Sequence, residues 1–242
     1  MITKTAIWCL CGLIAYGSFA GAQDATVTAD VALVNSGKKS KPRKADNVVL
    51  WLTPVAGTTV PTLPLARNAE RPRLVQKNKS FEPHVLVVPV GTSVEFPNRD
   101  PFFHNVFSLF EGKRFDLGLY EAGSTRNVVF DKPGVSYIFC NIHSEMSAVV
   151  IAVTSPYYGI SDRKGHVAIS HVPLGRYTMR IWYEDALPEE LNKLTREINI
   201  SPGASNLGAM RLPATNLPPS HENMYGRDYT PPLPDSPSYE RH

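Results

Sequence analysis

The sequence has few cysteines, nearly balanced charge and no apolar run of membrane-spanning length. Two of its three cysteines, Cys9 and Cys11, lie in an N-terminal apolar stretch, which leaves Cys140 alone in the rest of the 242 residues. One cysteine cannot build an intramolecular disulfide framework or a four-thiolate zinc site. Residues 6–20 fall short of the about 20 apolar residues that a spanning helix needs, so no transmembrane segment is expected.

Residues 1–22 have the pattern of a secretory signal peptide. Lys4 is the only charge before Asp24, the apolar run follows it, and Ala20 and Ala22 supply small residues for a cleavage site. We expect cleavage near Ala22 and a periplasmic or secreted protein. An unpaired thiol is unusual in an oxidising compartment, so we expect Cys140 to take part in the function of the protein.

Charge and absent motifs exclude further classes. Without Lys4, the basic residues number 25 − 1 = 24 against 22 acidic ones, whereas a nucleic-acid-binding protein usually shows a strong basic excess. The paired His-x-His motifs of multicopper oxidases are absent, as is the second cysteine that a binuclear copper site needs. The Gly-x-Ser-x-Gly elbow of serine hydrolases is absent as well. We therefore expect neither nucleic-acid binding nor enzymatic activity.

Most of the remaining chain predicts β-strands, because short runs rich in Val, Ile, Phe and Tyr alternate with Gly, Pro, Asn and Asp clusters. The candidate strands are residues 26–35, 47–53, 84–90, 93–97, 105–108, 125–130, 135–140, 147–154, 166–169 and 176–184. Residues 84–90 are apolar on both faces, which places them in a sandwich interior. Pro89 indicates an edge or a bulge near the end of that strand.

Two alternatives remain open for residues 187–200. Pro188 is suited to the first position of a helix in which Leu187, Leu191, Leu194 and Ile198 share one face. The same residues also fit a turn that leads into a strand. Further on, residues 213–242 contain seven prolines and few aliphatic side chains. That composition predicts a disordered tail over residues 212–242.

Metal-binding chemistry gathers where a predicted strand ends. Cys140, His143 and Met146 lie within seven residues, and His104 begins another strand upstream. Two imidazoles, one thiolate and one thioether form the ligand set of a trigonal copper site with a long axial methionine. Zinc binding by the same residues is an alternative. In a purely structural alternative, the cysteine and the methionine fill the core and His143 lies on the surface.

Other histidines and aromatic residues have weaker claims. We expect His84 to be a packed histidine rather than a ligand, and His166 and His171 to be structural or surface residues. Phe102 and Phe103 precede the first candidate ligand directly. They are expected in the core, and the alternative is an apolar rim at which a partner protein docks.

The stretch from about residue 74 to residue 154 resembles the cupredoxins, the blue-copper fold of plastocyanin and amicyanin. The motifs that carry the resemblance are Phe81-Glu82-Pro83, residues 90–96, His104-Asn105-Val106, the Pro133-Gly134 turn and the short amicyanin-like spacing of Cys140, His143 and Met146. The resemblance implies one type 1 copper ion held by ring nitrogens of His104 and His143, the Cys140 thiolate and a weak axial Met146. It also implies that Asn105 hydrogen-bonds across to the Cys140 loop.

Residues 155–211 resemble the carboxypeptidase-regulatory-like, prealbumin-type β-sandwiches. Two motifs carry this resemblance, residues 161–169 and residues 172–177. The expected fold is therefore all-β, a cupredoxin Greek-key sandwich at residues 73–154 with a second sandwich. We expect the second sandwich to be discontinuous and to combine residues 23–72 with 155–211. The alternative is two tandem domains.

Together these features lead us to expect a periplasmic type 1 copper protein that acts in electron transfer with a redox partner protein. Small periplasmic proteins of this type are sometimes grouped with methylamine-utilisation proteins. The alternatives are a copper carrier or delivery protein, and an envelope binding protein with a structural copper site.

Overall fold

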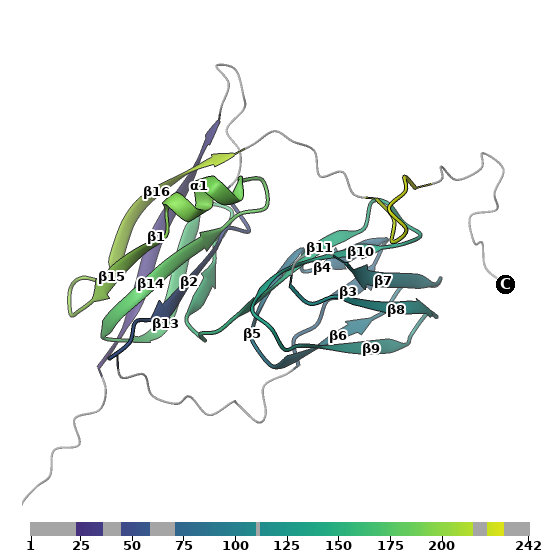
Figure 1. The fold of residues 1–242 in the computed structure, drawn as a ribbon, viewed down its shortest axis with the longest axis horizontal. Helices are drawn as coiled ribbons and strands as arrows, with labels where there is room; N and C mark the ends of the chain where they lie inside the picture. Colours follow the sequence, from purple (N-terminus) through teal and green to yellow (C-terminus); the bar gives the residue numbers. More distant parts are fainter. Residues whose placement is uncertain (1–22, 36–44, 59–70, 110–111, 215–221, 230–242) are drawn as a thin grey trace, which may run out of the picture.

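The computed structural model describes residues 23–35, 45–58, 71–109, 112–214 and 222–229. These residues form two β-sandwiches that lie side by side, with one short helix (Figure 1). The all-β prediction is confirmed. The predicted signal peptide and much of the predicted tail lie outside the described residues. Among the described residues, no helix has the length and apolar content needed to cross a membrane.

The first sandwich contains the candidate ligands. Its larger sheet has, in spatial order, the strands β5 (Val85–Pro89), β11 (Ser147–Val153), β10 (Gly134–Cys140), β7 (His104–Ser108) and β8 (Phe115–Tyr120). Its second layer consists of two strand pairs, β3 (Val75–Lys77) with β4 (Ser80–Glu82), and β6 (Thr92–Pro97) with β9 (Thr125–Phe130). Isolated parallel bridges link Arg73 to Glu95 and Gln76 to Asn98, and so join the two pairs into one layer.

The second sandwich combines strands from both sides of the first one in the sequence. One sheet has the order β13 (His166–Pro173), β1 (Asp24–Asn35) and β16 (Asn206–Ala214). The other has the order β12 (Tyr158–Ile160), β2 (Val49–Pro54), β14 (Gly175–Trp182) and β15 (Arg196–Ile200). Since β1 and β2 pair with strands that follow residue 154, the second sandwich is discontinuous.

Strands β5 and β11 are buried on both faces, which explains their continuous apolar sequence. On β5, Val88 packs in the core of the first sandwich, while Val85 and Val87 belong to the apolar cluster of the second. On β11, Val150 and Ile151 divide between the two clusters in the same way. β5 is the edge strand that Pro89 indicates, and the second sandwich covers its outer face. The two sandwiches therefore share one apolar interface.

The two motifs of the second sandwich have local structural roles. The Asp162 carboxylate accepts hydrogen bonds from the backbone N–H groups of Lys164 and His166, which closes a tight turn. Gly165 has a φ of +85° in that turn, and a Cβ there would lie 2.1 Å from a backbone oxygen of β1, so only glycine fits. The buried Tyr177 hydroxyl donates to the Pro173 carbonyl at 2.7 Å. The first motif thus closes the turn from β12 into β13, and the second holds the β13–β14 hairpin.

Both alternatives for residues 187–200 occur in succession. Helix α1 (Pro188–Lys193) begins with proline at its first turn and buries Leu191. Strand β15 follows at once and pairs with β14. The predicted tail needs a correction, because residues 212–214 belong to strand β16 and Leu212 is fully buried. Pairing of β16 with β1 supplies the stabilisation that the local composition does not indicate.

His84 lies where the two sandwiches meet, outside the group of candidate ligands found among the described residues. Its Nε2 atom lies 2.6 Å from Glu184 Oε2, and its Nδ1 atom lies 3.2 Å from the Ser147 carbonyl oxygen. The hydrogen bond to Glu184 raises the pKa of His84, and burial opposes that rise. Asp185 adds a smaller attraction. The side chain is 39% exposed, so the packed position expected for it is only partly correct.

We expect His84→Gln to destabilise the protein more at about pH 5.5 than at about pH 8.5. A histidine with a raised folded-state pKa contributes stability below its unfolded pKa of about 6.5, and that contribution is lost as the pH rises through the folded value. The difference should stay below about 1 kcal/mol, because the ion pair is partly exposed. Denaturant unfolding at both pH values measures it, and Glu184→Gln should remove the same pH dependence. Equal losses at both pH values would contradict this assignment.

Candidate metal centre

Strand pairing brings the candidate ligands together. Strand β7 begins at His104 and runs antiparallel to β10, which ends at Cys140. The loop that follows β10 is closed by two backbone hydrogen bonds, from Cys140 N to the Met146 carbonyl at 3.3 Å and from Met146 N to the His143 carbonyl at 3.1 Å. Its Asn141 N–H donates to the Asn105 carbonyl at 2.9 Å, which ties the loop to β7. The scaffold therefore positions His104 and Cys140 at strand ends, and His143 and Met146 on the short closed loop that follows β10.

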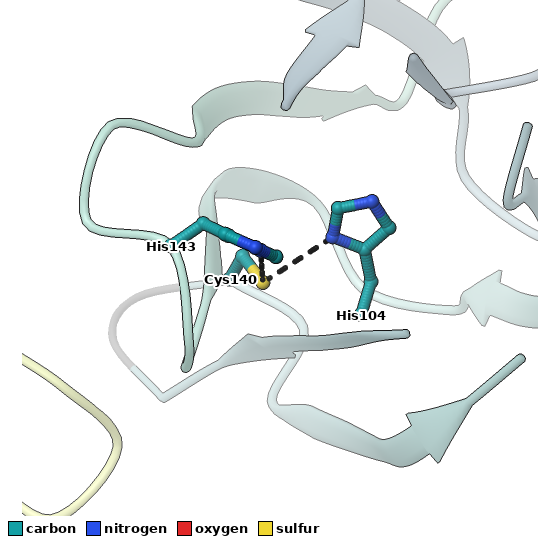
Figure 2. A group of neighbouring side chains, drawn as sticks. All are labelled: His104, Cys140 and His143. Carbon is teal, nitrogen blue, oxygen red and sulfur yellow. Dashed lines mark hydrogen bonds between the residues drawn. The ribbon is translucent and has the colours of Figure 1, made fainter. Parts of the chain in front are cut away.

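Three donor atoms converge at one end of the first sandwich (Figure 2). The Cys140 Sγ atom lies 3.7 Å from His104 Nδ1 and 3.5 Å from His143 Nδ1. All three donor atoms lie within 4.8 Å of one another. A metal ion at about 2.3 Å from sulfur and about 2.0 Å from nitrogen, with an angle between tetrahedral and trigonal, separates these two atoms by about 3.5 to 3.7 Å. The residues present therefore fit a single metal ion.

Burial differs among the four predicted ligands. His104, Cys140 and Met146 are all fully buried, whereas His143 is half-buried. Met146 packs in the same apolar cluster as Cys140. Its backbone also lies next to that of Cys140, because the Cys140 N–H donates to the Met146 carbonyl at 3.3 Å. His143 is the ligand nearest to solvent.

The surroundings favour neutral imidazoles and a protonated thiol in the metal-free chain. Burial lowers the pKa of His104, although the Asp100 carboxylate opposes that shift. Burial and the neighbouring His104 lower the pKa of His143. Burial also raises the pKa of the Cys140 thiol, against hydrogen bonds from the backbone N–H groups of Asn105, Ile142 and His143. Neutral imidazole is the form that binds metals, while the thiol releases its proton on binding.

Asp100 is a site residue that sequence reasoning missed. Its buried carboxylate accepts a hydrogen bond from His104 Nε2 at 2.9 Å, and it also accepts from the backbone N–H groups of Asn78 and Lys79. This bond places the proton of the neutral His104 ring on Nε2 and leaves Nδ1 free to face Cys140. A carboxylate behind a ligating histidine commonly fixes its ring in this way. The only sequence signal is an aspartate four residues before the candidate ligand.

Phe102 and Phe103 form an apolar rim, so their predicted place in the core is wrong. Phe103 is 49% exposed, and Phe102 is half-buried. The Phe102 ring centroid lies 5.3 Å from that of His104 and 5.4 Å from that of His143. One aromatic ring therefore contacts both candidate imidazoles, as the rim alternative expects, and docking of a partner protein at this rim stays a prediction.

The loop of residues 141–146, here called the metal-binding loop because it carries two of the candidate ligands, is bonded to the backbone of Asn105. The Asn105 carbonyl accepts from Asn141 N, and the Asn105 N–H donates toward the Cys140 sulfur. Its side-chain amide turns the other way and donates to Asp116 Oδ1 at 2.7 Å, on strand β8. The expected link between Asn105 and the Cys140 loop is therefore present, but it does not depend on the asparagine side chain.

The described part of the predicted tail also contacts this loop. The Tyr229 hydroxyl donates to the Cys140 carbonyl at 2.8 Å, and the Met224 N–H donates to Asn141 Oδ1 at 3.0 Å. Burial, together with the nearby Cys140, raises the pKa of Tyr229, so its hydroxyl keeps the proton that it donates. The prediction of a disordered tail is wrong for residues 222–229. Nothing in the local composition signals this contact.

No family model matches the chain, and no curated protein sequence matches it. Among solved structures, a purple cupredoxin from Nitrosopumilus maritimus is 24% identical; the match covers 34% of this chain and 99% of that one, with a TM-score of 0.31. A reduced mutant of amicyanin is 21% identical, over 36% of this chain and 88% of that one, with a TM-score of 0.33. The copper-containing nitrite reductase of Thermus scotoductus SA-01 is 24% identical, over 50% of this chain but 28% of its own length, with a TM-score of 0.33.

The fold and the site define an all-β protein with a buried group of two imidazoles and one thiol at the end of a sandwich. Its structural neighbours include cupredoxins. The assignment of a metal to this group rests on the donor atoms of the chain itself.

Proposed function

We propose that this protein is a type 1 copper protein that transfers electrons. The convergence of His104 Nδ1, Cys140 Sγ and His143 Nδ1 carries the proposal. One thiolate with two imidazoles suits copper in both of its common oxidation states, and a methionine at longer distance completes such a site. Copper in this position would accept and release one electron.

The chain's own residues explain why such a site would work. Asp100 orients His104, while backbone N–H groups of β7 and of the loop hold the Cys140 sulfur. Burial of Cys140 and Met146 excludes water from the inner side. His143 is the most exposed ligand, and the Phe102 ring lies against it. Electrons would therefore enter and leave at His143, where a redox partner protein can approach.

The test is the optical spectrum of the metal-free mature chain during titration with Cu(II). A thiolate-to-copper charge-transfer band of high intensity in the visible range, saturating at one equivalent, is the expected result. A colourless Cu(II) complex would reject electron transfer and favour a copper carrier. Zn(II) should occupy the same residues more weakly, since copper exceeds zinc in the general order of affinities. Failure of Cu(II) to displace Zn(II) would favour a zinc site.

We expect Met146→Leu to keep the visible band and to shift the reduction potential. The side chain is fully buried, and leucine has a similar volume, so folding should be nearly unaffected. An axial thioether tunes the potential of such a site without being needed for the thiolate band. Spectroelectrochemistry measures both quantities. Complete loss of copper binding, or an unchanged potential, would contradict the axial role.

The remaining parts of the proposal follow from the sequence. Export to the periplasm rests on the signal-like residues 1–22. The role of an electron carrier, rather than of an enzyme, rests on the absent catalytic motifs. For the second sandwich we propose a carboxypeptidase-regulatory-like fold that braces the first. Its apolar cluster includes Val85, Val87 and Val149 of the first sandwich, which supports a bracing role.

A further inference from the structure

Residues 222–229, here called the C-terminal clasp, lie against the end of the first sandwich at which β10 and β11 are joined (Figure 1). The clasp makes two hydrogen bonds to the metal-binding loop, from Tyr229 to the Cys140 carbonyl and from Met224 to the Asn141 side chain. Its two acceptors are thus a candidate ligand and the residue after it. Met224 and Tyr229 are half-buried, whereas residues 225–228 between them are exposed.

The clasp is a turn with its own hydrogen bonds. The Asn223 side-chain oxygen accepts from the N–H groups of Tyr225 and Arg227 at 2.9 and 3.2 Å. The Asn223 N–H donates to the Arg227 carbonyl, and Gly226 takes a φ of +68° in the same turn. An asparagine that hydrogen-bonds the backbone two residues on, followed by glycine, is typical of a stable turn. The clasp therefore presents Met224 and Tyr229 from a defined local structure.

The peptide group between Cys140 and Asn141 is held at both of its polar atoms. Its carbonyl accepts from the Tyr229 hydroxyl at 2.8 Å, and its N–H donates to the Asn105 carbonyl at 2.9 Å. The plane of this peptide sets the direction in which the loop leaves Cys140. The N–H groups of Ile142 and His143, which donate toward the Cys140 sulfur, follow in the next two residues. The hydrogen bond to this carbonyl thus affects both the direction of the loop and the placement of the N–H groups that donate toward the Cys140 sulfur.

The clasp also connects the two sandwiches along the chain. Strand β16 pairs with β1 in the second sandwich and ends at Ala214, and the clasp begins eight residues later on the first sandwich. The same chain end is therefore anchored in the second sandwich and at the metal-binding loop of the first.

We propose that the C-terminal clasp holds the metal-binding loop in its ligand-bearing conformation, with Tyr229 as the positioning residue and the second sandwich as its anchor. Loop ordering by the clasp is a property of the metal-free chain. Its effect on the copper spectrum rests on the proposed function.

The test compares Tyr229→Phe with Tyr225→Phe in the metal-free mature chain. Tyr225 lies in the same turn and is 72% exposed, so it controls for the loss of a phenol hydroxyl. Loss of one hydrogen bond should speed amide hydrogen exchange at Asn141 and Met146 by about 2- to 10-fold in Tyr229→Phe, with no change in Tyr225→Phe. A chain that ends at Ala214 should exchange at least as fast as Tyr229→Phe. Unchanged exchange rates at Asn141 and Met146 in both Tyr229→Phe and the shortened chain would overturn the proposal.

A second measurement adds Cu(II) to the same variants. Tyr229→Phe should keep the visible band but shift its wavelength and the reduction potential, while Tyr225→Phe should match the unaltered chain. A role of Tyr229 in general stability alone would leave both quantities unchanged and would overturn its role as a positioning residue. If the unaltered chain gives no visible band, the electron-transfer proposal fails, and the exchange rates in the metal-free chain still decide the role of the clasp.

Discussion

Replacing Cys140 by serine should abolish the visible band that Cu(II) produces in the unaltered chain. That band arises from the bond between copper and a thiolate, and Cys140 is the only cysteine left after residue 11. Serine has nearly the same size, so the buried position should tolerate it. The two imidazoles would remain and would bind Cu(II) weakly without the colour. Absorption spectra of the two chains at equal copper loading measure this loss. The intensity of the visible band should fall by more than about tenfold, because the band requires a copper–thiolate bond.

Surface histidines provide the control for this experiment. His166 and His171 lie on the second sandwich, where they face Asp30 and Asp24. His166→Gln and His171→Gln remove imidazoles that could bind Cu(II) adventitiously, and they should leave the band unchanged. A Cys140→Ser chain that retains the band, or a histidine control that loses it, would show that copper binds elsewhere.

The second large effect is expected at Asp100. Asp100→Ala should weaken copper binding by about 10- to 100-fold, the usual range when a residue that orients a metal ligand is removed. Without the carboxylate, the buried Nε2–H of His104 loses its acceptor and the ring is free to turn. Asp100→Asn keeps an oxygen for that N–H, so its loss of affinity should be smaller. Competition with a chelator of known affinity measures both variants.

Asp100 also holds a turn, and that role requires a matched control. Its carboxylate binds the backbone N–H groups of Asn78 and Lys79, both of which have positive φ. Asp162 binds two backbone N–H groups of a turn in the second sandwich in a similar way. Asp162→Ala should therefore cost stability without changing copper affinity. If both alanine variants weaken copper binding equally, Asp100 acts only through the fold.

Much of the fold was predictable because strand signals are local. Alternation of side chains, β-branched residues and turn residues marked most strands of both sandwiches within short windows, although the short strands β3, β4 and β12 were not among the candidates. The apolar run of β5 was recognised as doubly buried, and Pro89 indicated an edge. Both statements hold together, because β5 is the edge strand of its sheet and the second sandwich covers its outer face. Strand β16 was missed, because its pairing partner β1 lies at the other end of the chain.

The residues of the candidate metal centre were likewise predicted only in part. Cys140, His143 and Met146 stand close together in the sequence, and His104 could be grouped with them because it completes the ligand set of a copper site. Asp100, Phe102 and Tyr229 contact the same centre, but their residue types are common and their local sequence is unremarkable. Phe102 was placed in the core because apolar residues usually lie there. Phe102 is instead half-buried in the turn before β7, against the two imidazoles, a position that local sequence does not specify.

By itself, the sequence determined the all-β class, the donor types available to a metal and the position of the one cysteine after residue 11, since these depend on residue chemistry and short-range pattern. Only the tertiary structure decided which side chains support those donors. The bond from Tyr229 to Cys140 joins residues 89 positions apart, and the bond from His84 to Glu184 joins residues 100 positions apart. Contacts of that range follow from strand pairing and sandwich packing, which place distant segments together by the burial of apolar surface rather than by local preference.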